Sequence, residues 1–372
     1  MADSNPASAA MPLDADLTAW LRLSLAPGLG GEALRRLLAA FGDPQRVLAA
    51  SRGALAKHVA DPVATAIKQN DAGAAISQVA AWLKDPANSV LTLADAHYPQ
   101  QLLQIPDPPA LLYVKGHAEL LSRPSFAVVG SRNATAQGLA NAEAFARTLS
   151  DAGLAVVSGL ALGIDAAAHR GGLAGTAGSV AVLGTGADIV YPARNRALAH
   201  ALAARGALVS EFPLGTRPLA GNFPRRNRLI SGLALGCLVV EAAVDSGSLI
   251  TARLAAEQGR EVFAIPGSIH SPLAKGCHAL IKQGAKLVES ASDILEELRL
   301  SMPTPPAPAP AAAVDAQAQR LLDALGYETC DVDTLAARCD LPAAEIAAQL
   351  TRLELDGHVA VLAGGLIQRV QR

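Results

Sequence analysis

Residues 125–132 read Ser-Phe-Ala-Val-Val-Gly-Ser-Arg, a short apolar run that ends at a glycine. Comparable runs recur downstream, each bounded by glycine or proline and followed by helical spacing, at Leu154–Val157, Ser179–Leu183, Ala207–Val209, Cys237–Val240, Val262–Ile265 and Lys286–Val288. Apolar runs that do not alternate with polar residues are typical of parallel strands buried on both faces. The sequence therefore predicts an α/β fold with a doubly wound, mostly parallel sheet, in which ligands bind at the carboxyl ends of the strands.

A proline-rich segment follows the predicted sheet in the sequence and divides the chain. Residues 302–313 read Met-Pro-Thr-Pro-Pro-Ala-Pro-Ala-Pro-Ala-Ala-Ala. Because proline removes backbone donors and fixes φ, this segment indicates an extended linker. A softer break lies at residues 86–89. We therefore expect a helical N-terminal domain, the α/β domain, a Pro/Ala-rich linker and a small C-terminal domain, over residues 1–88, 89–300, 301–315 and 316–372.

The N-terminal segment has helical periodicity. In Glu32–Phe41 the apolar residues fall on one amphipathic stripe, at Leu34, Leu37, Leu38 and Phe41. The preceding residues 27–31 read Pro-Gly-Leu-Gly-Gly. This turn resembles that of a helix-hairpin-helix in a SAM-like domain, where glycine lets helix amides approach a phosphate. A turn that only joins two packed helices is the alternative.

The C-terminal segment has the pattern of a winged helix. We expect three helices followed by a hairpin, at Ala318–Leu325, Val332–Arg338, Pro342–Asp356, Val359–Leu362 and Leu366–Val370. Winged helices often bind DNA. Residues 316–372, however, carry eight acidic and five basic side chains, a net charge of −3, which disfavours phosphate. We therefore expect this domain to contact a protein or to have a structural role.

Charge is unevenly distributed along the chain. The net charge of −2 argues against a nucleic-acid partner, because affinity for phosphates comes from clustered lysine and arginine. Residues 89–300, however, carry sixteen acidic and eighteen basic side chains. Between Glu211 and Glu241 every charged residue is an arginine, at Arg217, Arg225, Arg226 and Arg228. This stretch is the one part of the chain whose local positive charge favours binding of a polyanion.

The cysteines and the hydropathy indicate a cytoplasmic protein. None of the four cysteines is spaced as C-x-x-C, so we expect reduced thiols, no disulfide framework and no metal site. Neither a basic segment followed by an apolar signal run nor an uninterrupted membrane-spanning run is found in the sequence. No membrane association and no cofactor are expected.

The residues after the first two strands suggest phosphate binding. Gly130-Ser131-Arg132 combines close backbone approach, the free amides of the following helix and a permanent charge, which together would make a phosphate cradle. It is not the dinucleotide fingerprint G-x-G-x-x-G. An Arg132 paired with a neighbouring carboxylate is the alternative. After the second strand, Ser158-Gly-Leu-Ala-Leu-Gly-Ile-Asp165 offers another close approach, and we expect Asp165 to pair with His169 one helical turn later.

Two further segments favour a single nucleic-acid strand. Residues 222–228 read Asn-Phe-Pro-Arg-Arg-Asn-Arg, and an aromatic ring among arginines suits an unstacked base flanked by phosphates. A buried Phe223 with surface arginines is the alternative. Ser246-Gly-Ser-Leu-Ile-Thr251 follows an apolar strand that ends at Glu241, and predicts a second anion-binding helix start. No nucleophile, metal cluster or acid pair in the sequence has a clear catalytic role.

In combination, these motifs closely resemble the DNA-processing protein A family, DprA, also called Smf. The match extends over about 200 residues and consists of several segments in order: Gly130-Ser131-Arg132, residues 158–165 with His169, Tyr191-Pro192 with Asn195, Ser210-Glu211, residues 223–228, residues 246–252 and Pro266-Gly267. Helical N-terminal and winged-helix C-terminal domains fit the same family. His278 departs from it, because many members have asparagine in that G-x-N-x-L-I stretch.

The resemblance implies an extended Rossmann-like fold, a homodimer and sequence-independent binding of single-stranded DNA. It also implies loading of RecA recombinase onto strands coated by single-strand binding protein in natural transformation, without catalytic residues. Arg132 matches the phosphate-binding arginine of the Gly-Ser-Arg motif. The expected DNA-binding residues are Gly130, Ser131, Arg132, Ser158, Gly159, Gly163, Phe223, Arg225, Arg226, Asn227, Arg228, Ser246, Gly247, Ser248 and Lys282.

Two rival functions remain open at this point. A Rossmann-like nucleoside-monophosphate hydrolase of the lysine-decarboxylase-like group also joins a glycine-rich helix start to an arginine and a glutamate, as residues 246–251 after Glu241 do. The P-G-G-x-G-T signature of that group is absent from the sequence. A pure interaction scaffold is the third possibility.

Overall fold

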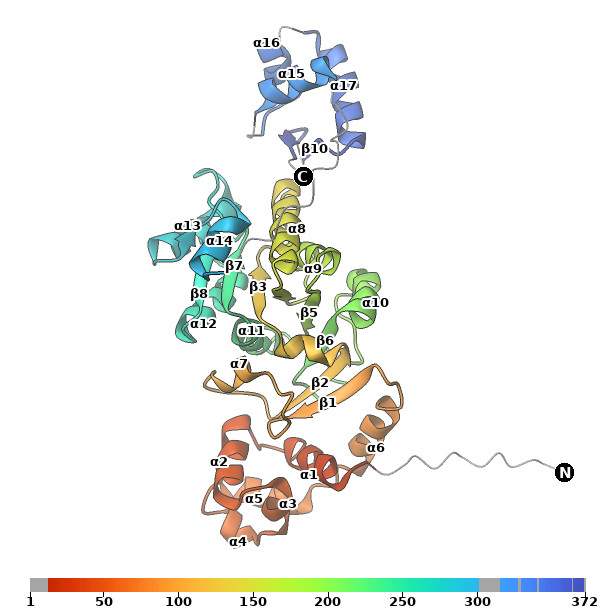
Figure 1. Ribbon diagram of the computed structural model, residues 1–372, viewed down its shortest axis with the longest axis vertical. Helices are drawn as coiled ribbons and strands as arrows, with labels where there is room; N and C mark the ends of the chain where they lie inside the picture. The colour runs from red at the N-terminus through yellow and green to blue at the C-terminus, as the bar shows by residue number, and fades with distance from the viewer. Residues whose placement is uncertain (1–12, 301–314, 327–328, 340, 363, 371–372) are drawn as a thin grey trace, which may run out of the picture.

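The computed structural model describes residues 13–300, 315–326, 329–339, 341–362 and 364–370. Figure 1 shows N-terminal helices at one end, an α/β part in the middle and a small C-terminal part at the other end. The N-terminal helices are α1 (Ala15–Ser24), α2 (Gly31–Phe41), α3 (Pro44–Ala49), α4 (Arg52–Leu55), α5 (Asp61–Gln69) and α6 (Gly73–Trp82). The amphipathic helix predicted from Glu32 is confirmed as α2.

The central sheet has nine strands in the order β1-β2-β6-β5-β4-β3-β7-β8-β9. Seven of them, β3 to β9, pair in parallel and confirm the apolar runs: β3 (Ser125–Val129), β4 (Ala155–Ser158), β5 (Ser179–Val182), β6 (Ala207–Ser210), β7 (Gly236–Val239), β8 (Glu261–Ala264) and β9 (Lys286–Leu287). The doubly wound α/β class is therefore confirmed.

Two antiparallel strands extend the sheet beyond what the sequence predicted. They are β1 (Asn88–Thr92) and β2 (Leu111–Gly116), and β2 pairs with β6 while β1 forms the edge. Residues of β2 alternate between two cores: Leu112 and Val114 join the core of the main sheet, and Leu111 and Tyr113 pack with the N-terminal helices. The strand thus connects the helical segment to the sheet.

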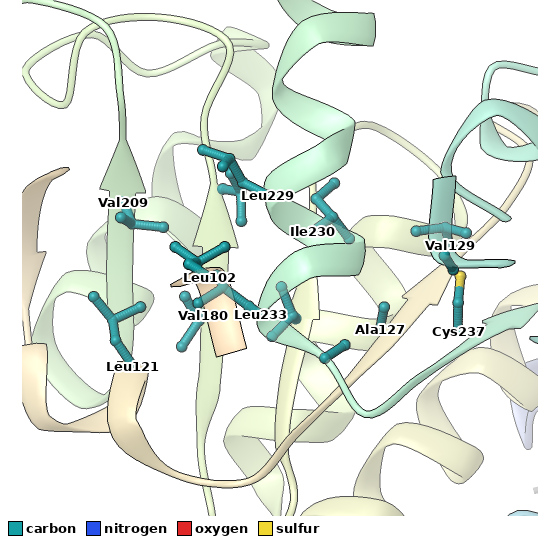
Figure 2. Close-up of a cluster of buried hydrophobic side chains, with 14 of the residues drawn as sticks. Leu102, Leu121, Ala127, Val129, Val180, Val209, Leu229, Ile230, Leu233 and Cys237 are labelled. Carbon is teal, nitrogen blue, oxygen red and sulfur yellow. The ribbon is translucent and has the colours of Figure 1, made fainter. Parts of the chain in front are cut away.

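Helices cover both faces of the sheet. One face packs against α7 (Gln100–Leu103), α11 (Asn222–Leu233), α12 (Ser248–Glu257) and α13 (Lys275–Lys282), and Figure 2 shows Leu102 of α7 and Leu229, Ile230 and Leu233 of α11 against side chains of this sheet. The other face packs against α8 (Ala136–Asp151), α9 (Ile164–Ala174), α10 (Arg196–Arg205) and α14 (Ala291–Glu297). Short 3-10 turns lie at Ala118–Ser122, Ala193–Asn195 and Pro272–Ala274.

The chain reverses its direction of winding at β3. From β3 the strands add on one side through β4, β5 and β6, and then α11 leads back to β7 on the other side of β3. Loops that follow two neighbouring parallel strands therefore diverge to opposite faces between β3 and β7. This topological switch point is where doubly wound sheets bind ligands.

The C-terminal part confirms the predicted winged helix. It contains α15 (Ala316–Leu325), α16 (Val332–Cys339), α17 (Ala343–Leu355) and the hairpin of β10 (Val359–Val361) with β11 (Ile367–Arg369). The apolar faces of its helices form a separate core that includes Leu321, Leu335, Ile346, Leu350 and Leu353. The predicted Pro/Ala linker lies mostly outside the described residues.

Three further expectations concern the cysteines, membrane-spanning helices and metal ligands. The four cysteines are free thiols, and Cys237 and Cys277 lie within the main core. Among the described residues, no helix is long and apolar enough to cross a membrane. Within the same ranges, no cluster of three or more His, Cys, Asp or Glu side chains is arranged to hold a metal ion.

Candidate nucleic-acid interface

A pocket of about 830 Å³ opens at the switch point. Its walls come from the loop after β3, the loop after β4, the start of α11 and the loop between β7 and the first turn of α12. Of the predicted site residues, it brings together Gly130, Ser131, Arg132, Phe223, Arg226, Asn227, Ser246, Gly247 and Ser248. Segments that are far apart in the sequence thus converge on one cavity, as the positions of the strand ends predicted.

Arg132 lies exposed at the rim of this pocket. Its guanidinium makes no hydrogen bond or ion pair with any residue that the structure describes, so the alternative of a carboxylate-bound Arg132 is wrong. The backbone beside it is tightly fixed: the Ser131 amide donates to the Glu241 carbonyl oxygen at 2.7 Å, and the Ser131 carbonyl accepts from the Ile164 amide at 3.1 Å. A free cation on a fixed backbone suits contact with a phosphate.

The helix start behind Arg132 differs from the prediction. Glu241 accepts a hydrogen bond from the Thr135 amide at 2.9 Å and another from the Thr135 hydroxyl at 2.6 Å, and that hydroxyl accepts from the Gly138 amide. The carboxylate packs directly against Gly138, where a side chain would collide with it. The predicted free-amide cradle at α8 is therefore wrong, because a carboxylate from the protein already occupies that positive helix end.

The loop after β4 is held from beneath by buried side chains. Asp165 accepts from the amides of Gly159 and Ala161, and His169 Nε2 accepts from the Leu160 amide at 3.2 Å. Asn195 donates to the carbonyl oxygens of Leu160 and Ala161. The predicted Asp165–His169 pair is therefore wrong: the two residues share the task of fixing one loop rather than holding each other.

Burial shifts the pKa values of His169 and Asp165 in opposite directions. Desolvation lowers the pKa of His169 to about 3, with the Arg226 charge adding to the effect. His169 is therefore neutral, with Nδ1 donating to the Ser179 hydroxyl at 2.8 Å. Desolvation raises the pKa of the Asp165 carboxyl, which Arg226 and the loop amides oppose.

Arg226 lies at the floor of the pocket and is not a surface arginine. Its side chain is buried, with 4% of the residue exposed. Its Nη1 donates to the Val182 carbonyl oxygen, and its guanidinium lies 6.0 Å from the centre of the Phe223 ring. Gly159 is required beside it, because any side chain there would meet the guanidinium. Desolvation lowers the pKa of Arg226 to about 10, so the side chain stays charged at neutral pH.

Two aromatic rings lie at the pocket wall. Phe223 is half-buried, and Tyr191 has 47% of its surface exposed. Their ring centres are 5.5 Å apart, at an interplanar angle of 40°. The alternative of a buried Phe223 with surface arginines is not met, because Phe223 is only half-buried and, although Arg225 is exposed, Arg226 is buried. Tyr191 was not among the predicted site residues, although its Tyr-Pro motif was recognised.

Arg225 and Arg228 pair with a carboxylate of the protein and do not line the main pocket. The Glu211 carboxylate accepts from Arg228 at 2.6 Å and from Arg225 at 3.3 Å, and Arg228 also lies 3.4 Å from Asp107. Both arginines line a second pocket of about 390 Å³ that the glycine turn of residues 28–31 also lines. The run of arginines is thus divided between two sides of α11.

The second pocket also tests whether the N-terminal glycine turn binds a phosphate. Arg35 of α2 pairs with Asp107 at 2.8 Å, and a side chain at Gly31 would lie 2.9 Å from the same carboxylate. A phosphate at this turn would therefore meet a carboxylate. The geometry favours the alternative, in which the glycines allow two structural parts to pack closely.

The remaining predicted residues lie outside the main pocket lining. The Ser158 hydroxyl donates to the Val128 carbonyl oxygen in the sheet. Gly163 has a φ of 75° and packs against the backbone of residues 131–132, so it shapes the pocket from behind. Lys282 lies exposed at the last residue of α13. Asp165, Asp245 and Ile250 line the pocket without having been predicted as site residues; Asp165 and Ile250 belonged to recognised motifs, and Asp245 did not.

Two protein-family models match this chain. The model described as "DNA recombination-mediator protein A" matches residues 89–299, and the model described as "DprA winged helix domain" matches residues 305–365. Curated relatives include Protein Smf of Escherichia coli, 44% identical over 77% of this chain and 79% of the relative, and DNA processing protein DprA of Streptococcus pneumoniae, 47% identical over 58% of this chain and 74% of the relative.

Two solved structures of DNA processing protein A are also similar to this chain. The crystal structure of DprA from Streptococcus pneumoniae is similar with a TM-score of 0.66 at 38% identity, covering 77% of this chain and 99% of that one. A Helicobacter pylori structure is similar with a TM-score of 0.52 at 28% identity, covering 57% of this chain and 95% of that one, and its description concerns the single-stranded DNA binding mode of DNA processing protein A.

Proposed function

The chain belongs to the DNA recombination-mediator protein A family, DprA or Smf, and we propose that it binds single-stranded DNA in the switch-point pocket without regard to sequence. The observation that carries the proposal is the pairing, in one cavity, of an unpartnered Arg132 with the Tyr191 and Phe223 rings. Base faces are available to such rings only in a single strand, and stacking on them tolerates any base.

The contact residues we propose are those that line this cavity. Arg132 neutralises a phosphate at the rim, and the small residues Gly130, Ser131, Gly247 and Ser248 let the strand approach the backbone. Phe223 and Asn227 on α11 and Tyr191 opposite them provide the remaining wall. We do not include Lys282, Arg225 or Arg228 in this set, because they lie outside the lining.

Titration of fluorescent oligonucleotides tests the proposal. A thymidine oligomer should bind with higher affinity than a duplex of the same length, and binding should persist when the base sequence is scrambled. Equal retention of single strand and duplex would contradict it, and no retention at low salt would favour an interaction scaffold. Incubation with nucleoside monophosphates should release no free base, because we propose a binding protein without catalytic residues.

We further propose that the bound strand is passed to RecA. In this proposal the protein acts in the cytoplasm during natural transformation, on strands coated by single-strand binding protein, and works as a homodimer. RecA filament formation on coated strands, with and without the protein, is the direct test.

A further inference from the structure

A groove of about 570 Å³ lies between α15 and α16 of the winged helix, in the C-terminal part of the molecule in Figure 1. Its lining comes from one face of α15, from the last turn of α16 and from the residue that precedes Pro342. The side chains that give this winged-helix groove its chemistry are Arg320, Leu321, Ala324, Arg338, Cys339 and Leu341. No residue is shared with the lining of the switch-point pocket, so the groove is a separate site.

The floor of the winged-helix groove is an incompletely covered part of the domain core. Leu321 belongs to that core and is 1% exposed. Ala324, Cys339 and Leu341 pack against the same core but stay partly exposed. Covering apolar surface of this kind removes it from water and is favourable. The floor therefore suits an apolar side chain of a partner.

Two arginines give the groove its charge. Arg320 and Arg338 are the charged residues of the lining that the structure describes, and both are exposed. Arg338 Nη1 donates to the Ala324 carbonyl oxygen at 3.2 Å, which holds the end of α16 against α15. The Arg320 guanidinium makes no hydrogen bond or ion pair within the described part of the chain. Neither arginine has an acidic partner there.

Arginines without acidic partners are unexpected in this domain, because residues 316–372 have a net charge of −3. Two other arginines of the domain do pair, Arg352 with Asp315 at 3.4 Å and Arg369 with Asp323 at 3.6 Å. The acidic side chains that the structure describes after Asp315 are exposed outside the groove lining, at Asp323, Asp331, Asp333, Glu345, Glu354 and Asp356. The groove is therefore a basic site on an acidic domain.

From the apolar floor and the two arginines we infer that the winged-helix groove binds a short acidic segment of a partner protein. An apolar side chain of that segment covers the floor, and its carboxylates meet Arg320 and Arg338. The inference goes beyond the proposed DNA binding and does not depend on it.

A nucleic-acid strand fits the winged-helix groove less well than an acidic peptide does. Its backbone continues past a groove of this size and meets the exposed acids of the domain, which repel it within a Debye length of about 8 Å. A phosphate also gains nothing from an apolar floor. A short peptide keeps its few charges beside the arginines and uses the floor as well.

Three fluorescent peptides test the charge and the floor with the full-length protein. The first has four glutamates around a central leucine and phenylalanine. The second replaces the glutamates with lysines, and the third replaces the apolar pair with serines. In fluorescence anisotropy the glutamate peptide should bind at low salt and more weakly as the salt concentration rises. The lysine and serine peptides should each bind at least about tenfold more weakly.

A substitution connects this binding to the groove. Because Arg320 is exposed and has no partner within the described chain, Arg320→Gln should fold normally and weaken binding of the glutamate peptide about three- to fivefold. The matched control is Arg352→Gln, which removes the same charge from the same domain outside the groove and should leave the affinity unchanged. Neither substitution should change the affinity for oligo-thymidine.

Cys339 is a natural reporter inside the groove. The other three cysteines are buried, whereas Cys339 is partly exposed, although desolvation raises the pKa of its thiol. A thiol reagent should therefore modify Cys339 first in the folded protein. At a glutamate-peptide concentration of about ten times its Kd, this reaction should slow about tenfold, because only the free groove reacts. Oligo-thymidine should leave the rate unchanged.

Each opposite result would overturn the inference. If no peptide binds, or if the lysine or the serine peptide binds as well as the glutamate peptide, the groove does not recognise an acidic, apolar segment. Equal losses in Arg320→Gln and Arg352→Gln, or an unchanged rate at Cys339, would place the bound peptide elsewhere on the protein. Protection of Cys339 by oligo-thymidine would make the groove a nucleic-acid site instead. Single-strand binding in the switch-point pocket stands or falls separately, by oligonucleotide titration.

Discussion

At the scale of single residues, the pocket depends on a strained leucine. Leu160 has a φ of 57° and is fully buried, a conformation that costs a residue with a side chain about 1–3 kcal/mol. Such backbone persists only where its surroundings determine it. Here His169, Asp165 and Asn195 hold the amide and carbonyl groups around it, and the loop in turn packs against Arg226. The polar residues of this motif thus fix the pocket floor rather than perform chemistry.

His169 should make the fold sensitive to mild acid. Its pKa is about 3 in the folded protein and ~6.5 when unfolded, so only the unfolded chain gains this proton between those values. The stabilising contribution is complete above pH ~6.5 and is lost as the pH falls. The wild-type protein should lose roughly 2 kcal/mol more unfolding free energy than His169→Gln between pH 7 and pH 5. Urea denaturation of both proteins measures this, and parallel pH profiles would contradict it.

Arg132 should set part of the salt dependence of DNA binding. Because its guanidinium is exposed without a protein partner, Arg132→Ala should weaken binding to all sequences alike and reduce the slope of log affinity against log salt by roughly 0.7. The matched control is Arg123→Ala, because Arg123 is also exposed but precedes β3 instead of following it. An unchanged slope in folded Arg132→Ala would remove Arg132 from the interface.

At the scale of elements, α11 divides the arginine-rich motif between two sides. Phe223, Arg226, Asn227 and Ile230 line the main pocket at the spacing of one helical face, and Arg225 and Arg228 meet Glu211 on another. The sequence could have predicted this division if residues 222–228 had been placed on a helix. Pro224 obscured it, but proline is tolerated in a first helical turn, where amides have no intrahelical partner.

Phe223 should contribute to binding more than to folding. Its ring is half-buried and packs on Tyr191, so Phe223→Ala should reduce single-strand affinity by about 1–3 kcal/mol. Oligonucleotide titration and thermal denaturation of the same variant separate the two effects. A loss of stability that exceeds the loss of binding would show that the ring belongs to the core.

Glu211 should contribute to folding and not to DNA binding. Its side chain is 4% exposed and holds two arginines, of which Arg228 is 13% exposed. Glu211→Ala would leave the Arg228 charge buried with one remaining partner at Asp107, which should destabilise the fold by about 3 kcal/mol. The salt slope of DNA binding should not change, because these arginines lie outside the main pocket. Chemical denaturation measures the first effect, and a changed slope would contradict the second.

At the scale of the whole molecule, the predictability of the fold follows the strength of each signal. The parallel strands β3 to β8 were visible because burial on both faces leaves continuous apolar runs between helices, whereas both residues of β9 are exposed. β1 and β2 were missed because they join antiparallel and only the four-residue helix α7 separates them, so the regular alternation of strand and long helix does not surround them. The contribution of Glu241 to the start of α8 could not be predicted, since it joins residues 106 positions apart.

The charge distribution gives the last prediction, which concerns the winged helix. We propose that the chain divides at about residues 88, 300 and 315, so that a chain ending at Arg299 folds on its own. With a net charge of −3 over residues 316–372, the C-terminal domain repels phosphates within a Debye length of about 8 Å. The shortened chain should therefore keep single-strand affinity within about tenfold of the full chain.

Oligo-thymidine titration at moderate salt compares three lengths of the protein: the full chain, a chain ending at Arg299 and a control ending at Asp315, which keeps the linker but not the winged helix. Because the residues that line the switch-point pocket all precede Arg299, the two shortened chains should bind alike. If both lose more than about tenfold, equivalent to roughly 1.4 kcal/mol, the winged helix contacts DNA in spite of its acidic charge. If only the chain ending at Arg299 is weakened, the contribution belongs to the linker.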